Sequence, residues 1–277
     1  MTPFLKMHGL GNDFVVFDAR RDALALDSAR ARGLADRRFG IGCDQVIVIG
    51  EGRGKSDAAM RIYNGDGGEV ESCGNAARCV ARLLMEETDR DRVTIDTQGG
   101  ELICVDAGDG GVTVDMGAPR FRWNEIPLSQ AQDTDDFALD LDGETHRAAA
   151  VNIGNPHCVL FVQDVQSAPV ATLGPRIETD PLFPDRTNVE FVDVKDRTHL
   201  RMRVWERGAG ITSACGTGAC AAAVAAHRRG LAERKVEVML DGGALTIEWR
   251  ESDGHVLMTG PATLAFRGDV DLGAYPS

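Results

Sequence analysis

An internal repeat constrains this chain more than any other feature of its sequence. The stretch from Arg203 to Cys215 aligns without a gap with the stretch from Arg61 to Cys73, and each copy ends in a Cys-Gly pair after a glycine-rich loop. The other landmarks that keep an offset of 142 or 143 positions are Gly11-Asn12 with Gly154-Asn155, Asp44-Gln45 with Thr187-Asn188, Gln98-Gly-Gly with Asp241-Gly-Gly, and Gly117 with Gly260. One register over most of the chain predicts a duplication, and two copies predict a pair of pseudo-symmetric domains rather than a solenoid.

The segment after the second cysteine indicates how each domain is built. Residues 219–226 are alanine apart from one valine and one cysteine, and a helix that is apolar on every side is buried on every side. Because the flanking segments alternate like strands, we expect an α+β fold in which each domain is a β-barrel-like sheet wrapped around a central helix. A plain two-layer α+β sandwich is the alternative. We place the first domain at residues 1–118 with 263–277, and the second at 119–262.

Local patterns predict several individual elements. The segment from Phe4 to Arg20 reads as two strands around a Gly9–Asp13 turn. We expect a helix over Ser28–Arg38, capped by Asp27 or Ser28, and a second helix from Cys73 to about Glu87. Residues 124–146 are expected to form a loop with one strand.

Composition excludes several classes of function. The net charge of −13 comes with no basic stripe, which argues against nucleic acid as a partner. The amino terminus lacks the pattern of a signal peptide, and no window reaches the length of a membrane span, so we expect a cytoplasmic protein with no membrane partner.

The seven cysteines show no Cys-x-x-Cys pair, and the histidines show no His-x-x-x-His pair, which predicts no metal site. We expect most of the thiols to be small buried hydrophobic groups: these are Cys43, Cys79, Cys104, Cys158 and Cys220.

Cys73 and Cys215 differ from these because each stands at the start of a predicted helix. Ser72 is able to cap the first helix, whereas Ala214 cannot cap the second. The free N–H groups and the helix dipole at such a position favour a thiolate. The same region suits a substrate carboxylate, and the residues whose N–H groups form this cradle are Gly74, Asn75, Gly216 and Thr217.

Two thiols at mirrored positions have one specific use. Inverting a stereocentre needs a base on one face of the carbon and an acid on the other, and a thiolate facing a thiol serves in either direction. The alternative is that both cysteines are structural and were retained after duplication.

The chain resembles diaminopimelate epimerase over nearly its whole length. The segments that carry the resemblance are 7–14, 39–45, 63–67, 73–79, 152–157, 186–190, 205–210 and 214–219. The family's pattern differs at two positions, since Cys43 replaces a small apolar residue and Ala76 stands where glycine is common.

The resemblance implies an isomerase that interconverts LL- and meso-2,6-diaminoheptanedioate for lysine and cell-wall synthesis, with no cofactor or metal. It implies Cys73 and Cys215 as the acid/base pair, with His157 and Glu206 tuning the thiols. It also implies a homodimer with Phe266 in the contact. The residues it implies for the substrate shell, beyond the carboxylate cradle, are Asn12, Gln45, Asn64, Asn155, Asn188, Glu206 and Arg207.

The repeat loses its symmetry beside the second cysteine. Glu206 occupies the place of Asn64, and Arg207 that of Gly65. A guanidinium matches a carboxylate with two parallel hydrogen bonds, so we expect Arg207 to bind the distal carboxylate, with a surface arginine as the alternative. Two other functions stay open: a proline racemase or hydroxyproline epimerase, and a cysteine-based redox sensor or binding protein.

Overall fold

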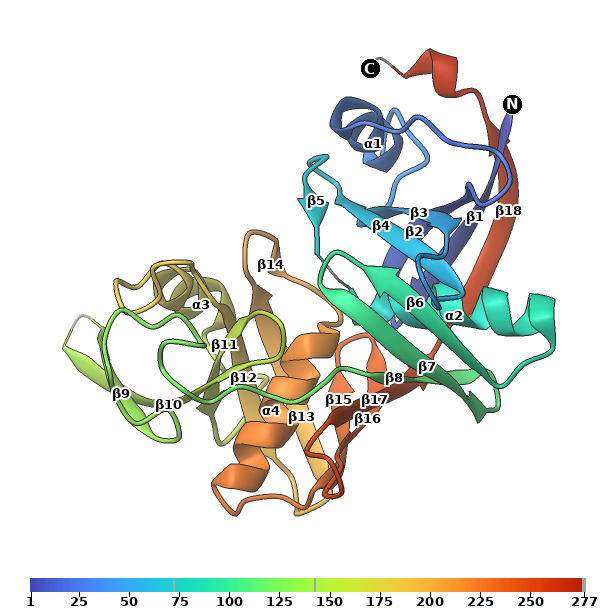
Figure 1. Ribbon diagram of the computed structural model, residues 1–277. Helices are drawn as coiled ribbons and strands as arrows, with labels where there is room; N and C mark the ends of the chain where they lie inside the picture. The colour runs from blue at the N-terminus through green and yellow to red at the C-terminus, as the bar shows by residue number, and fades with distance from the viewer. Residues whose placement is uncertain (72, 142, 276–277) are drawn as a thin grey trace. The chain divides into compact units, whose positions relative to one another are not determined.

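The computed structural model describes residues 1–71, 73–141 and 143–275 (Figure 1). Contacts between Cα atoms divide the chain into two compact units. Unit 1 comprises Met1–Val114 and Gly260–Ser277, and unit 2 comprises Asp115–Thr259. The chain therefore leaves the first unit once, completes the second, and returns.

Unit 1 is built from strands that surround one long helix. Its elements are β1 (Thr2–Gly9), β2 (Asn12–Asp18), α1 (Ser28–Ala35), β3 (Gln45–Glu51), β4 (Ala58–Asn64), β5 (Glu69–Val70), α2 (Gly74–Thr88), β6 (Arg92–Thr97), β7 (Gly100–Gly108), β8 (Gly111–Asp115, which ends at the boundary), β18 (Thr263–Val270) and the 3-10 turn η1 (Leu272–Ala274). Helix α2 packs against β1, β6 and β7. It buries a continuous run from Gly74 to Ala81.

Unit 2 repeats this plan. Its elements are β9 (Phe137–Leu141), β10 (Glu144–Asn152), β11 (Pro156–Phe161), α3 (Val170–Glu178), β12 (Asn188–Val194), β13 (His199–Glu206), β14 (Gly210–Ile211), α4 (Gly216–Arg228), β15 (Lys235–Leu240), β16 (Gly243–Trp249) and β17 (Val256–Pro261, which crosses the boundary). Helix α4 contacts strands β10 to β13, β15 and β16, and its residues 218–226 are buried.

The strand pairings establish the duplication. In unit 1 the pairs β1–β2, β2–β3, β3–β4, β4–β6 and β6–β7 run antiparallel, parallel, antiparallel, parallel and antiparallel. The pairs β10–β11, β11–β12, β12–β13, β13–β15 and β15–β16 of unit 2 follow the same order. Registers agree as well, because Phe14 pairs with Gln45 and His157 with Asn188. The expected α+β fold, with a sheet around a central helix in each half, is confirmed.

One expectation about local structure was wrong. The first helix ends at Ala35 rather than Arg38, because the Asp36 side chain accepts hydrogen bonds from the N–H groups of Arg38 and Phe39 and turns the chain.

The single strand expected within residues 124–146 is confirmed. It is β9, which alternates buried and exposed residues and pairs antiparallel with β10, the strand that begins at Glu144.

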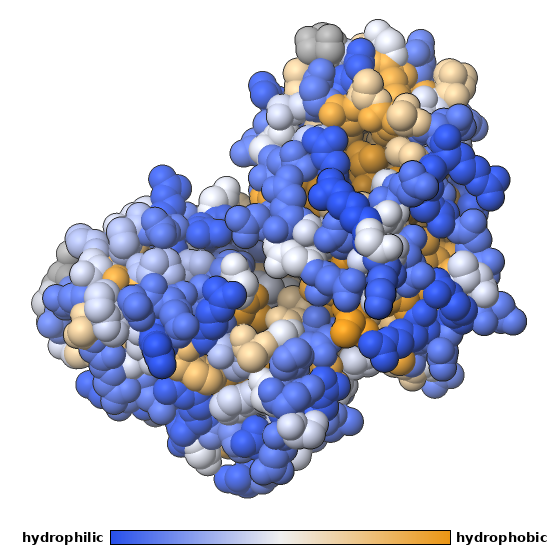
Figure 2. Space-filling model, in the orientation of Figure 1, coloured by the Kyte–Doolittle hydropathy of each residue, from blue (hydrophilic) through white to orange (hydrophobic). Residues whose placement is uncertain are grey.

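The polar surface and the burial of most thiols agree with what the composition predicts. Hydrophilic residues cover most of the face drawn in Figure 2. Among the described residues, no helix is long and apolar enough to cross a membrane. The five cysteines expected to be buried have exposures of 4% or less, which confirms that expectation: they are Cys43, Cys79, Cys104, Cys158 and Cys220.

Candidate active site

The two singled-out cysteines occupy the same position in the two units. Cys73 is the N-cap residue of α2, with φ −149° and ψ 111°, and Cys215 is the N-cap residue of α4, with φ −119° and ψ 111°. Each cysteine carbonyl accepts the first helical hydrogen bond, from Ala77 and Ala219 respectively. Both thiols therefore stand where the helix dipole favours negative charge. Ser72, the expected cap, lies outside the described residues.

In unit 1 the amide of Asn12 is fixed at both ends. Its Nδ2 donates to Asp44 Oδ2 over 2.9 Å, and its Oδ1 accepts from Asn75 Nδ2 over 3.1 Å. Asn75 is buried in the first turn of α2, two residues after Cys73. The hydrogen bonds thus connect the β1–β2 turn to the start of the helix that carries the thiol.

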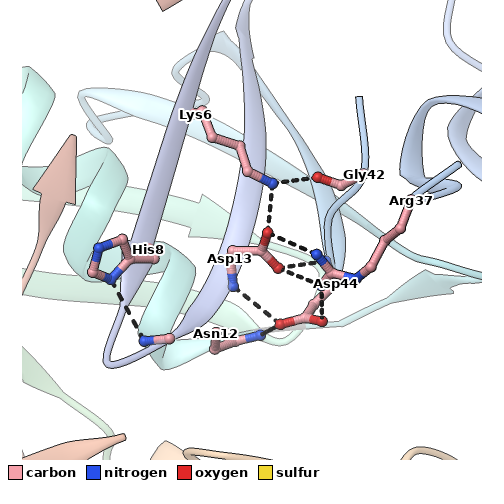
Figure 3. Close-up of polar contacts among 8 residues, drawn as sticks. Lys6, His8, Asn12, Asp13, Arg37, Gly42 and Asp44 are labelled. Atoms are coloured by element: carbon pink, nitrogen blue, oxygen red, sulfur yellow. Dashed lines mark hydrogen bonds and ion pairs between the residues drawn. The ribbon is translucent and has the colours of Figure 1, made fainter. Parts of the chain in front are cut away.

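A charged network holds Asp44 in place (Figure 3). Arg37 donates to Asp44 Oδ1 and to Asp13 Oδ1, both over 2.7 Å, while Lys6 bonds Asp13 over 2.5 Å. Burial raises the pKa of Asp13, but the hydrogen bonds from Arg37 and Lys6 outweigh it and lower the pKa to about 2. Asp13 is therefore ionised at neutral pH and anchors both cations.

Two further predicted site residues of unit 1, Gln45 and Asn64, are hydrogen-bonded to each other. Gln45 and Asn64 are opposite in the β3–β4 register, and Gln45 Nε2 donates to Asn64 Oδ1 over 2.9 Å. Gln45 directly follows Asp44, so it lies beside the network that holds Asn12.

In unit 2, Cys215 lies among carboxylates. Burial raises its pKa well above the usual thiol range, and Glu206 and Glu190 raise it further. At Cys215, burial and the two acidic neighbours therefore oppose the effect of the helix dipole. The hydroxyl of Thr217 lies 3.6 Å from the sulfur.

Glu206 is one of the two acidic neighbours of Cys215. Burial of its carboxyl group raises the pKa of Glu206 to about 7, against the opposing hydrogen bond that Thr212 donates to it. A carboxyl group that titrates near neutral pH is suited to exchanging a proton with a neighbouring thiol.

His157 is fully buried between two partners. Its Nδ1 lies 2.8 Å from Glu190 Oε1, and its Nε2 lies 2.8 Å from Asn155 Oδ1. Glu190 is also fully buried and was missed as a site residue by our sequence analysis. The signal was available, because the repeat places apolar Ile47 opposite Glu190 and Phe14 opposite His157.

Asn188 and Arg207 are joined through the backbone. Asn188 Oδ1 accepts from the N–H of Arg207 over 3.0 Å, and its Nδ2 donates to the Pro156 carbonyl. The exposed Arg207 side chain donates to the carbonyl of Asp185 over 3.1 Å. Within the described ranges its guanidinium forms no ion pair, so it is available to an anionic ligand.

The remaining predictions concern the dimer contact and metal binding. Phe266, on β18, is 51% exposed, and its ring meets that of Phe4 edge-on at 6.1 Å. No cluster of metal-ligating side chains occurs in the part of the chain that the structure describes.

Known proteins match both halves of the chain. The family model for diaminopimelate epimerase matches residues 4–122 and 149–265. Diaminopimelate epimerase from Erythrobacter litoralis is 54% identical over 273 residues, covering 98% of each chain. The enzyme of that name from Rhodospirillum centenum is 53% identical over 268 residues, which are 96% of this chain and 91% of the relative.

Solved structures that resemble the chain are more distant. A hydroxyproline epimerase from Agrobacterium vitis has a TM-score of 0.69 at 16% identity and covers 96% of this chain and 91% of its own. A phenazine biosynthesis protein of the PhzF family from Bacillus anthracis has a TM-score of 0.68 at 14% identity, with coverage of 98% and 99%. At these identities the likeness establishes a shared fold.

Proposed function

Since the chain belongs to the diaminopimelate epimerase family, we propose that it interconverts LL- and meso-2,6-diaminoheptanedioate in the synthesis of lysine and peptidoglycan precursors. The observation that carries the proposal is a pair of cysteines at equivalent helix starts, in a chain about half identical to enzymes of that name over nearly its full length. The likeness to a hydroxyproline epimerase concerns the fold alone, so it gives no support to proline as the substrate.

The reaction is a proton exchange at Cα that uses both thiols. One cysteine, as the thiolate, removes the Cα proton, and the electron pair of the C–H bond passes to Cα and its carboxylate. The other cysteine, as the thiol, then gives its proton to the opposite face of Cα. After turnover the two sulfurs have exchanged roles, so the same pair serves the reverse reaction.

The developing charge on the substrate carboxylate needs donors. The first turns of α2 and α4 place the backbone N–H groups of Gly74, Asn75, Gly216 and Thr217 at helix starts, where each helix dipole has its positive end. We assign these residues to the reacting carboxylate. They lower the barrier because their donors are already oriented before the proton leaves.

Glu206 prepares Cys215 for both of its roles. The buried thiol holds its proton firmly, so it is ready to act as the acid. For it to act as the base, the thiol proton passes to the neighbouring Glu206 carboxylate, whose pKa, raised to about 7, makes it a stronger base than an ordinary carboxylate. His157 tunes the thiol chemistry together with Glu190, the buried carboxylate to which it is hydrogen-bonded.

The residues that break the symmetry of the repeat bind the distal end of the substrate. Arg207 binds the distal carboxylate, Asn64 and Asn188 are further donors to this end, and Asn12, Gln45 and Asn155 complete the shell. Support comes from the exposed guanidinium of Arg207 and from the hydrogen bond by which Asn188 holds its backbone.

We further propose a cytoplasmic homodimer that works without a cofactor. Support for Phe266 in the dimer contact comes from strand β18, where Phe266 is 51% exposed and Leu264 on the same strand is 38% exposed, since neighbouring exposed apolar side chains favour an interaction surface.

Replacing either cysteine tests the assignment of the acid and the base. Cys73→Ala and Cys215→Ala are expected to lose turnover of LL-diaminopimelate by at least about 1,000-fold, because each removes one of two obligatory proton carriers. Cys104→Ala, which removes a thiol fully buried in β7, is the matched control and keeps its turnover. Near-normal turnover in either of the first two variants would contradict the proposal.

A further inference from the structure

A buried carboxylate lies beneath the start of the helix that carries Cys215. Glu190 is on β12, one strand from His157 on β11, and neither side chain is exposed. Within the described part of the chain, Glu190 Oε2 has no hydrogen-bond partner. Because an unsatisfied buried carboxylate oxygen is costly, the fold gains something from keeping this group.

The first turn of α4 is shaped around that carboxylate. A Cβ atom built on Gly218 would stand 2.8 Å from Glu190 Oε1 and 3.2 Å from Cys215 Sγ. The matching position in unit 1 is Ala76, which is fully buried, and the strand beneath it carries the equally buried Ile47 in place of a carboxylate. Only the half with Glu190 therefore needs a glycine at this position.

The histidine above Glu190 is held at both ring nitrogens. Nδ1 meets a carboxylate oxygen of Glu190, and Nε2 meets Oδ1 of Asn155. Since an amide oxygen only accepts, Nε2 must carry the hydrogen and donate it. One proton then lies between Nδ1 and the Glu190 carboxylate, whichever of the two holds it, and the pair as a whole has no net charge.

This hydrogen bond decides which end of the Asn155 amide is available. With Oδ1 bound to His157, the Nδ2 group with its two N–H donors remains for a ligand. The equivalent asparagine of unit 1 is fixed differently, because Asn12 donates from Nδ2 to Asp44 and accepts at Oδ1 from Asn75. The two copies of one asparagine are thus oriented by unlike partners.

We propose that Glu190 is a positioning residue that acts through His157 to hold the Asn155 amide with its Nδ2 group toward the substrate. Without the Glu190 carboxylate, Nδ1 of His157 has no hydrogen-bond partner. The imidazole ring is then no longer held in one tautomer, and Asn155 loses its fixed orientation. The inference rests on the proposed function, since Asn155 belongs to the substrate shell assigned there. Its consequence is weaker substrate binding, because a donor to a substrate carboxylate is no longer held in place.

A double-mutant cycle tests this path. Glu190→Ile, which copies Ile47 of unit 1, and Asn155→Ala are each expected to raise KM for LL-diaminopimelate about 10-fold with less than a threefold change in kcat. In the double variant the two effects should not multiply, because both remove the same contact. Asp193→Asn changes another buried carboxylate of β12, one paired with Lys195, and should combine independently with Asn155→Ala.

Multiplicative effects of Glu190→Ile and Asn155→Ala, or an unchanged KM in Glu190→Ile, would overturn the proposal. So would a Glu190→Gln variant as impaired as Glu190→Ile, because the glutamine amide is able to donate to Nδ1 and to leave the hydrogen on Nε2. The stability of each variant is measured by unfolding in urea. Changes in KM that follow the loss of stability alone would also contradict the proposal.

A second measurement needs no variant of Glu190. In wild-type protein labelled with ¹⁵N-histidine, the ring signal absent from His157→Phe must show a hydrogen on Nε2, whereas an unprotonated Nε2 would overturn the inference. This result does not depend on turnover. A protein with the expected ring but no activity on diaminopimelate would contradict the proposed function and leave the orienting device intact.

Discussion

Substituting Gly218 by alanine would place a methyl group where Glu190 and Cys215 leave no room. The new Cβ would lie 2.8 Å from Glu190 Oε1, 3.2 Å from Cys215 Sγ and 3.3 Å from Cys215 Cβ. Glu190 cannot swing away, since it is fully buried and bound to His157. The start of α4 or the carboxylate must therefore move by several tenths of an ångström.

The effect on stability is the sum of two opposing contributions. Overpacking a close-packed site costs about 1–3 kcal/mol. Alanine in place of glycine within a helix raises the free energy of unfolding by about 1 kcal/mol. The expected net loss is about 0–2 kcal/mol. Activity should suffer more, because misplacing a reacting group by about 1 Å costs on the order of 100-fold, so a shift of half that size predicts a loss of about 10-fold.

The assay compares urea unfolding with kcat for LL-diaminopimelate. Ala76→Gly is the reciprocal variant at the matching position of α2, where the strand below is apolar. It should lose about 1 kcal/mol of stability with kcat within about threefold of wild type. A Gly218→Ala protein with wild-type kcat would refute the reasoning, because it would mean that Cys215 and Glu190 are not held as closely as the structure places them.

Two further predictions concern residues that we propose bind or orient the substrate. Arg207→Ala should raise KM for diaminopimelate by about 100-fold, the value of a charge-assisted bidentate bond of about 3 kcal/mol, and an unchanged KM would show that this arginine belongs to the surface. Asp44→Ala should raise KM by about 10-fold by removing the acceptor that holds Asn12, while Asp18→Ala, which removes a similarly exposed partner of Arg20, should leave KM unchanged in the same steady-state assay.

The repeat made the larger features of the fold predictable. A gap-free match of two cysteine loops, followed by small-residue helices, indicated two units with a buried helix each, and helix starts at Cys73 and Cys215 followed from where the apolar pattern begins. Such features depend on local sequence and on periodicity. The end of α1 did not follow, because it depends on a turn that the Asp36 side chain closes.

The electrostatics of the site were harder to predict. The raised pKa of Cys215 did not follow from the sequence, because burial and the positions of Glu206 and Glu190 are products of tertiary packing. Glu190 was overlooked within a strand of apolar residues. Comparing the halves position by position would have found it, since His157 and Glu190 replace Phe14 and Ile47 together, which is the mark of a buried polar pair.

The mechanism that we propose is a cofactor-independent proton exchange between two thiols and one Cα. Its most direct test is to incubate LL-diaminopimelate with the protein in heavy water, without added cofactor, and to follow the Cα hydrogens by NMR and mass spectrometry. The account predicts meso product that carries one deuterium at the inverted centre. Meso product without deuterium, or no exchange at all until a cofactor is supplied, would contradict it.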